Sequence, residues 1–176
     1  MACDKPIYTQ AIQRRVYDYE RFNRTWSEYK KGFGSTGTGY WLGNDLIHNL
    51  TVEKATSLYV SITLTAGATL YERYDQFYIT VEADGYRIQL TGNTTGSLGD
   101  SMRVSWPNWN INGMKFSTFD RDNDMWTGGV CGHREGGWWF NECGLTFLNS
   151  DPIQNVLWDP VLSSKTQVRE TMMMIK

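Results

Sequence analysis

The alternation of apolar and polar residues predicts several β-strands along the chain. Residues 57–65 alternate most regularly, and residues 7–16 alternate in part. Residues 69–81 and 85–91 predict two further strands, and residues 168–175 can form one closing strand near the end of the chain. Strands are therefore the main regular structure that the pattern predicts.

Two short helices are predicted between the first two strands. Thr25 suits the N-cap position, and Glu28 stands three residues later, so that the two side chains can form a capping box. Gly32 is expected to end this helix. Asn44 is expected to cap a second short helix over residues 45–50.

Regular structure fades in the second half of the chain. Residues 92–99 are expected to form a turn-rich loop, and residues 100–155 hold many Gly, Asn, Asp and Trp with little periodicity. A loop region of this length inside a compact domain is usually functional or needs an external staple. With 176 residues and no repeat or linker, the chain is expected to be one domain, residues 1–176.

Composition and charge exclude some classes of partner. The 17 Lys and Arg nearly balance the 19 Asp and Glu, so we expect no nucleic-acid partner, which would need a strong basic excess. No apolar run is long enough to span a membrane, so we expect no membrane insertion. The 8 Trp, 10 Tyr and 7 Phe favour rings that fill a core, with aromatic platforms for sugars or peptides as the alternative.

The strongest local motif is the acidic run Asp120-Arg121-Asp122-Asn123-Asp124. Carboxylates at alternate positions converge when a loop curls around a cation, and Ca²⁺ takes about six to eight oxygen ligands from carboxylates, carbonyls and waters. The alternative is a solvated acidic turn. The run is no EF-hand loop, because it lacks the Gly and the distant bidentate Glu of that loop.

Three cysteines are present, Cys3, Cys131 and Cys143. A disulfide between the last two would close a short loop and stabilise the fold by roughly 2–3 kcal/mol in the chain-entropy treatment. The alternative is a pair of buried thiols in a cytosolic protein. A zinc site is disfavoured, because His48 and His133 are the only histidines and neither has zinc-finger spacing.

Three N-x-Ser/Thr sequons favour the secretory pathway, whereas the N-terminal residues do not. Asn23, Asn49 and Asn93 each begin such a triplet and are candidate glycosylation sites. The opening residues Met-Ala-Cys-Asp-Lys-Pro lack the apolar segment of a secretory signal, which taken alone indicates the cytosol.

Signatures of catalysis are weak. The sequence has no Gly-x-Ser-x-Gly elbow, no His-Glu-x-x-His and no phosphate-binding Gly-x-x-x-x-Gly-Lys. A nucleophile–histidine pair is nearly limited to His48 or His133, and a disulfide would remove Cys131 as a nucleophile. A glycosidase needs only two carboxylates, so composition alone leaves that class open. We expect that the protein is not an enzyme.

Taken in order, the motifs resemble the fibrinogen C-terminal domain family, which includes fibrinogen chains, ficolins, tachylectins, angiopoietins and tenascins. Each piece alone is weak, but their order and spacing span almost the whole chain and are together highly specific. The matching pieces are Ile12–Arg15, Phe22–Gly34, Tyr40–Asp45, Ile47-His48, Leu50-Thr51, Gly99–Met102, Met114–Thr118, Asp120–Asp124, Gly137–Phe140, Cys143 and Leu148-Asn149.

The resemblance implies an α+β fold with a short antiparallel sheet, a few short helices and a long loop-rich region that holds calcium and ligand. Family members bind calcium beside the ligand site, through two carboxylates and two following carbonyls. On this sequence these ligands are the carboxylates of Asp122 and Asp124 and the carbonyls of Trp126 and Gly128, with Asp120 in a supporting role.

The resemblance also implies a disulfide between Cys131 and Cys143, with the ligand pocket built around it. The peptide bond before the second cysteine is often cis in the family, and here that bond is Glu142–Cys143. A cis non-proline bond costs about 3 kcal/mol and needs a well-braced loop. The candidate pocket residues are His133, Arg134, Trp139, Asn141, Glu142, Cys143 and Gly144.

The sequence departs from the family near its N-terminus and in the acidic loop. Cys3 resembles a family cysteine whose partner lies upstream, so we expect it to be unpaired and the domain to lack its N-terminal segment. A fragment would also lack a secretory signal, and the sequons and the disulfide therefore favour a secreted protein. The stretch from Asp124 to Cys131 is one residue longer than usual, which can move the second carbonyl ligand to Gly129.

Two departures bear on the ligand. Sugar-binding members often carry His or Tyr after the second cysteine, whereas Gly144 stands here, as in members that act mainly through protein partners. The stretch after Leu148-Asn149 is short, which can remove one wall of the pocket.

The sequence therefore supports two functions. The first is a calcium-stabilised, lectin-like module that binds acetylated glycans or microbial surfaces in innate defence. The second is a protein-interaction module of receptor-ligand or matrix type, as in angiopoietins and tenascins. A third interpretation is a fragment that folds poorly without its N-terminal piece. Any homo-oligomer is expected to form through upstream segments that this chain lacks.

Overall fold

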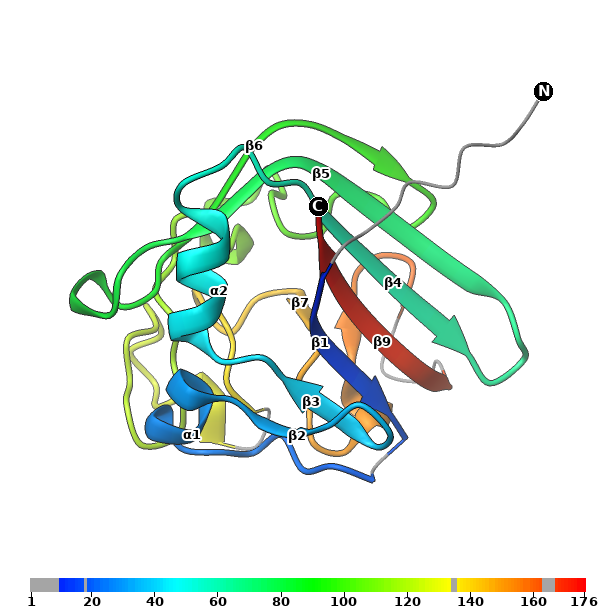
Figure 1. Ribbon diagram of the computed structural model, residues 1–176, viewed down its shortest axis with the longest axis horizontal. Coiled ribbons are helices and arrows are strands. Elements are labelled where there is room, and N and C mark those ends of the chain that lie inside the picture. Colours follow the sequence, from blue (N-terminus) through cyan, green and yellow to red (C-terminus); the bar gives the residue numbers. More distant parts are fainter. Residues whose placement is uncertain (1–9, 18, 134–135, 163–166) are drawn as a thin grey trace.

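The computed structural model describes residues 10–17, 19–133, 136–162 and 167–176. Within these ranges the main feature is a seven-stranded antiparallel sheet with the strand order β2-β3-β1-β9-β4-β5-β6 (Figure 1). Its strands are β1 (Gln10–Val16), β2 (Phe33–Ser35), β3 (Gly39–Trp41), β4 (Leu58–Leu64), β5 (Thr69–Ile79), β6 (Ile88–Gly96) and β9 (Val168–Ile175).

Short helices and a two-stranded ribbon complete the described part of the chain. The helices α1 (Trp26–Lys31) and α2 (Asn44–Thr51) contact each other, and α2 also packs on β5. The ribbon pairs β7 (Thr146–Phe147) with β8 (Leu157–Trp158). The 3₁₀ helices are η1 (Glu82–Asp84), η2 (Pro107–Trp109), η3 (Cys131–His133) and η4 (Ile153–Asn155).

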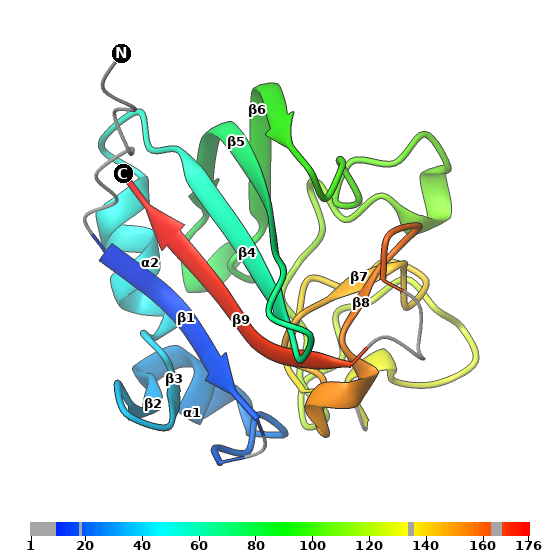
Figure 2. The ribbon, with the colours of Figure 1, turned by 90° about the vertical axis from the view of Figure 1, so that its right-hand side faces the viewer.

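The molecule divides into a sheet region and a loop-rich region. The sheet region consists of residues 10–98 together with β9, and the loop-rich region consists of residues 99–162. Figure 2 shows α1 and α2 on one side of the molecule and the loops around β7 and β8 on the other. Strand β9 lies between β1 and β4, so the last strand of the chain completes the middle of the sheet. The α+β fold class is confirmed.

Most of the predicted strands are confirmed, but both ends of one are wrong, because β6 begins at Ile88 and not at residue 85. Strands β4, β5 and β9 fall within the predicted segments, and β1 occupies the described part of residues 7–16. Strand β6, however, runs to Gly96, where the sequence predicts a turn-rich loop. A register shift against β5 between Tyr74 and Gln76 lets the ladder continue, because Gly92 adopts a φ of +74° there.

The first helix begins as the sequence predicts, and the second does not. At α1, Thr25 Oγ1 accepts the N–H of Glu28, and the N–H of Thr25 donates to the Glu28 carboxylate at 2.9 Å. Asn44 is no N-cap, because it lies inside α2 with Gly43 at the cap position. Its side-chain oxygen accepts the indole N–H of Trp41 at 2.9 Å, so the amide serves a buried ring instead.

A cluster of aromatic rings joins the two regions. Phe116 lies 5.1 Å from Tyr29 and 5.2 Å from Trp139 between ring centroids, and Trp139 lies 6.0 Å from Trp41. All four rings are buried, and the Trp139 indole donates to the carbonyl of Tyr86 at 2.8 Å. For these rings, core filling is confirmed. No helix in the described ranges is long and apolar enough to cross a membrane.

Candidate functional site

The loop over residues 120–131 curls around the carboxylate of Asp124. Asp124 Oδ1 accepts the backbone N–H of Trp126 at 2.9 Å, and Oδ2 accepts the N–H of Cys131 at 2.8 Å. The N–H of Asp124 donates in turn to Oδ1 of Asp122 at 3.2 Å. The sequence therefore places two carboxylates in one tight turn, and the following residues fold back toward them.

Two like charges are held together in this loop. Partial burial raises the pKa of Asp124, and so does the Asp122 carboxylate, against the lowering effect of the N–H groups of Cys131 and Trp126. Among the described residues, neither carboxylate forms an ion pair with a Lys or Arg. A carboxylate pair without a basic partner suits a divalent cation.

The other polar residues of the acidic run serve the fold. Asp120 accepts the N–H of Trp26 at 2.9 Å and the hydroxyl of Thr118 at 2.7 Å, so it ties α1 to the loop. The side chain of Asn123 donates to the carbonyl of Phe116 at 2.8 Å. Asp122 and Asp124 are therefore the carboxylates of the run whose hydrogen bonds stay within the loop.

Calcium at this loop would rely on carbonyl oxygens as well as carboxylates. No group of three or more His, Cys, Asp or Glu side chains that could hold a metal occurs in the described part of the chain. The predicted carbonyl ligands belong to Trp126 and Gly128, and a Cβ added at Gly128 would lie 2.6 Å from the Trp126 ring. A larger residue at position 128 would therefore displace the indole, and two carboxylates with carbonyls are a donor set that calcium accepts.

The predicted disulfide between Cys131 and Cys143 is confirmed, with the two Cα atoms 5.1 Å apart. The bridge fastens the end of the acidic loop to residues 141–145. The prediction of a cis bond at Glu142–Cys143 is wrong, because both cis bonds of the described residues precede prolines. Cys143 and Gly144 instead turn the chain with φ values of +60° and +76°.

The predicted pocket residues do not form one lining. Trp139 is a core residue, and Asn141 is buried with its amide bonded to backbone carbonyls. Glu142 is exposed and accepts the amide N–H of Asn108 at 2.8 Å. The half-buried Gly144 lies near Trp109 and Ile111. Arg134 and the side chain of His133 lie outside the described residues.

Residues 105–110, which no sequence motif marked as a site, bond to Asn141 and Glu142 beside the disulfide. Residues 105–110 contain Trp106 and Trp109, whose rings meet edge to face at 4.6 Å between centroids. With Trp126 they are the tryptophans outside the core, since the other five are buried. The local signal was the Trp-Pro-Asn-Trp sequence, which marks an aromatic turn but does not tell what the turn faces.

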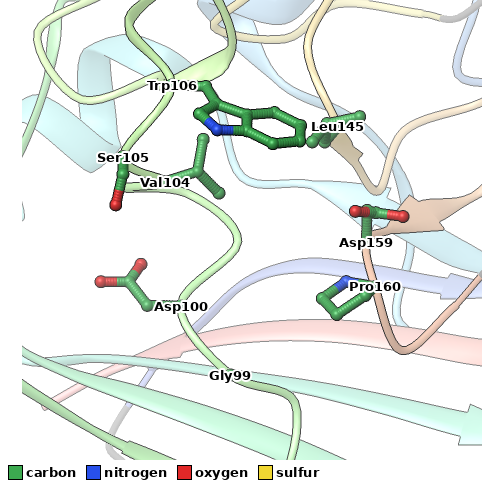
Figure 3. Close-up of a pocket in the computed structure, with 8 residues that line it drawn as sticks. All are labelled: Gly99, Asp100, Val104, Ser105, Trp106, Leu145, Asp159 and Pro160. Carbon is green, nitrogen blue, oxygen red and sulfur yellow. The ribbon is translucent and has the colours of Figure 1, made fainter.

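Trp106 forms one wall of a cavity of about 260 Å³ (Figure 3). In this view the carboxylates of Asp100 and Asp159 lie on opposite sides of the opening. Asp100 pairs with Arg103 at 2.8 Å, whereas Asp159 has no ion pair within the described residues. The cavity is lined by Gly99, Asp100, Val104, Ser105, Trp106, Leu145, Asp159 and Pro160. Its walls are largely apolar, its rim is acidic, and among the described residues no Lys or Arg lines it.

All three candidate glycosylation asparagines are exposed. Asn23 precedes α1, Asn49 lies on α2, and Asn93 lies on the edge strand β6. The threonine of the sequon at Asn49 is Thr51, which is buried and donates its hydroxyl to the carbonyl of Ile47 at 2.8 Å. The structure therefore leaves each asparagine accessible to a glycan.

Comparison with known proteins places the chain among relatives that are longer than it is. Fibroleukin of Bos taurus is 42% identical over 139 residues, which cover 78% of this chain and 31% of that protein. Angiopoietin-2 of Mus musculus is 36% identical over 174 residues, which cover 94% of this chain and 34% of that protein. The chain thus spans about a third of the length of these curated relatives.

Solved structures share the fold over most of the chain. The fibrinogen-like globe domain of human ANGPTL2 matches with a TM-score of 0.83 at 33% identity, covering 94% of this chain and 78% of that chain. Lamprey fibrin D-dimer, solved with the peptide ligand Gly-His-Arg-Pro-amide, matches with a TM-score of 0.84 at 28% identity, covering 94% and 60%.

The family comparison covers nearly the whole sequence. Residues 8–176 match the family described as "Fibrinogen beta and gamma chains, C-terminal globular domain". Sequence, fold and the confirmed disulfide agree, and the chain belongs to the fibrinogen C-terminal domain family.

Proposed function

We propose that this domain is a secreted, non-catalytic recognition module, stabilised by calcium, that binds a positively charged group of an extracellular protein in the cavity beside Trp106. The cavity carries this proposal. An indole wall suits the aliphatic part of a basic side chain or a peptide terminus, and the carboxylate of Asp159 suits its charge.

The charges of the cavity favour a cationic partner over a neutral one. Asp159 is half-buried and has no ion pair in the described residues, so a ligand cation would offset a charge that is now solvated only in part. The peptide bound by lamprey fibrin carries an N-terminal amine and an arginine, which is the same ligand chemistry. Gly144 in place of a larger residue also favours a protein partner.

Calcium is proposed to bind at Asp122 and Asp124, with carbonyl oxygens of Trp126 and Gly128 or Gly129 completing the site. The ion would offset the repulsion between the two carboxylates and stiffen a loop that belongs to no named strand and has one isolated bridge, between Arg121 and Thr118. Because such an ion binds only the folded loop, it stabilises the native state.

The test of the cavity is a calorimetric titration with Gly-His-Arg-Pro-amide. The control peptide is acetyl-Gly-His-Glu-Pro-amide, which has no N-terminal amine and carries a glutamate in place of the arginine. We expect the basic peptide to bind, and Asp159→Asn to weaken it about tenfold, which corresponds to 1.4 kcal/mol. Asp84→Asn is the matched control, because Asp84 is a surface carboxylate of the sheet region, paired with Arg87. Equal binding to the wild type and to Asp159→Asn, or no binding, would contradict the cavity proposal.

Glycan binding is the second candidate, and the exposed indoles favour it. Trp106 is 61% exposed and Trp126 is 46% exposed, and such faces can stack on sugar rings. A glycan array probed with the wild type and with Trp106→Ala tests this candidate. Binding of acetylated glycans that is lost in Trp106→Ala but kept in Asp159→Asn would favour the lectin-like function.

Secretion is proposed from the sequons, the disulfide and the family. Expression behind a secretory leader should give a protein whose mass falls on glycosidase treatment, with single Asn→Gln changes at Asn23, Asn49 and Asn93 showing which sites are used. A secreted protein without any attached glycan would contradict all three sites.

A further inference from the structure

Asn141 lies between the acidic loop and the tryptophan segment, residues 105–110. Its carbonyl oxygen accepts the N–H of Met125 at 2.9 Å, and Met125 directly follows Asp124 in the acidic loop. Its side-chain amide donates to the carbonyl of Pro107 at 2.7 Å and to that of Asn110 at 2.9 Å. The residue is 7% exposed, so these bonds are largely shielded from water.

The tryptophan segment has few other anchors. Its own turn is closed by the N–H groups of Trp109 and Asn110, which donate to the carbonyl of Trp106. Glu142 adds a backbone bond to the carbonyl of Asn108 at 3.1 Å and an exposed side-chain bond to the same residue. No strand of the described sheet pairs with this segment. The side chain of Asn110 adds bonds to the neighbouring residues Val104 and Asn112. Residues 141 and 142 therefore supply the hydrogen bonds that tie the segment to the disulfide-closed part of the chain.

The amide of Asn141 is matched to its place. Both of its N–H groups are used by carbonyl oxygens of one short turn, which a carboxylate or a hydroxyl of similar size would not provide. An aspartate here would set a charge against two carbonyls and leave those acceptors without donors.

We propose that Asn141 is a positioning residue that transmits calcium binding in the acidic loop to the Trp106 wall of the cavity. The inference rests on the proposed calcium site. Calcium fixes the turn that carries the N–H of Met125, this N–H holds the backbone of Asn141, and the Asn141 amide holds the turn that presents Trp106. Because such coupling is reciprocal, a ligand that orders the Trp106 wall also raises the affinity for calcium.

Hydrogen exchange of backbone amides, followed by mass spectrometry with calcium and with chelator, tests the coupling. In the wild type we expect calcium to slow exchange both in residues 122–131 and in residues 105–111. In Asn141→Asp we expect calcium to protect residues 122–131 as in the wild type. Its protection of residues 105–111 should fall by about fivefold or more, which is the lower end of usual coupling. Asn141→Ala serves as the milder variant if the aspartate prevents folding.

Asn112→Ala is the matched control. Asn112 also bridges backbone groups with its side chain, at the N–H and carbonyl of Leu90, but it contacts β6 and not the acidic loop. We expect this variant to keep the calcium-dependent protection of residues 105–111. A purely structural Asn141 would speed exchange equally with and without calcium, so the ratio between the two conditions separates positioning from stability.

The possible outcomes are distinct. Protection of residues 105–111 by calcium that persists in Asn141→Asp and Asn141→Ala would overturn the role of Asn141. Protection of residues 122–131 alone in the wild type would overturn the coupling and leave the calcium site intact. No protection anywhere would overturn the calcium site and the coupling together, while the binding of peptide in the cavity is measured independently.

Discussion

The sheet region and the loop-rich region are each stabilised internally by a different kind of hydrogen bond. In the sheet, backbone groups pair along ladders such as β4 with β5 and β9. In the loop-rich region, side chains satisfy the backbone: Asn112 bridges to Leu90, Asn123 bonds to Phe116, and Asn141 bonds to Pro107 and Asn110. Such a region depends on a few specific residues, so single substitutions should disturb it more locally than they disturb a ladder.

The two regions also use tryptophan differently. Trp41 and Trp139 fill the core in which the regions meet, whereas Trp106, Trp109 and Trp126 stand on the surface of the loop-rich region. A residue type that the composition favours as core filling therefore also supplies the candidate binding surface, and only the fold separates the two uses.

The largest expected effect follows from removing a ring at the junction of the regions. Trp139→Ala leaves a cavity beside Phe116 and Trp41 and frees the carbonyl of Tyr86, and should lower the free energy of unfolding by about 3–5 kcal/mol. Denaturant unfolding measures it. Trp106→Ala is the comparison, because an exposed ring should change stability by only about 0.5 kcal/mol. Equal losses for both variants would contradict the division of roles.

The next effect concerns the disulfide of the loop-rich region. Cys131→Ser combined with Cys143→Ser opens the loop and should lower the free energy of unfolding by about 3 kcal/mol in the chain-entropy treatment. The loss should weaken calcium binding as well, because the N–H of Cys131 bonds to Asp124. Calcium titration of the double variant checks this, and an unchanged affinity would mean that the acidic loop needs no staple.

A smaller effect is expected at the edge of the sheet region. Thr25→Ala removes the acceptor for the N–H of Glu28 in the capping box of α1 and should cost about 1 kcal/mol. Thermal unfolding with and without calcium checks it. The loss should be the same in both conditions, since the cap does not contact Asp122 or Asp124; a calcium-dependent loss would link α1 to the calcium site.

The smallest effect is a change in pH dependence. In chelator the folded-state pKa of Asp124 is raised, so its contribution to stability is present below its unfolded pKa and is lost as pH rises through the folded value. Asp122→Asn removes part of the repulsion, so the variant should lose less stability as the pH rises above about 4, the usual value of an aspartate. Unfolding at a series of pH values tests the sign, and a larger loss in the variant would refute it.

Periodicity was enough for most of the sheet region. Local patterns gave β4, β5, β9 and the capping box at Thr25, because strand alternation and caps depend on near neighbours in sequence. The predicted N-cap at Asn44 and the predicted end of β6 were wrong. The Asn44 side chain bonds to the buried indole of Trp41, and a register shift against β5 extends β6. Both features depend on contacts between residues that meet only in the folded chain.

In the loop-rich region the sequence identified residues but not their arrangement. The family resemblance implied the disulfide, which is confirmed, and it implied a supporting role for Asp120, whose carboxylate accepts the N–H of Trp26. It did not show that Trp139 belongs to the core or that Asp100 and Asp159 face one cavity. These two carboxylates are 59 positions apart, and no local pattern brings them together.

Thermal unfolding of the non-reduced domain, in calcium and in chelator, tests the account most directly. We expect one cooperative transition, and calcium should move it to higher temperature. At a calcium concentration of a hundred times the Kd, the free energy of unfolding should rise by about 2.7 kcal/mol. Asp122→Ala combined with Asp124→Ala should abolish this shift and keep the transition. A wild-type transition that ignores calcium, or a full shift in the double variant, would contradict the calcium-braced recognition region.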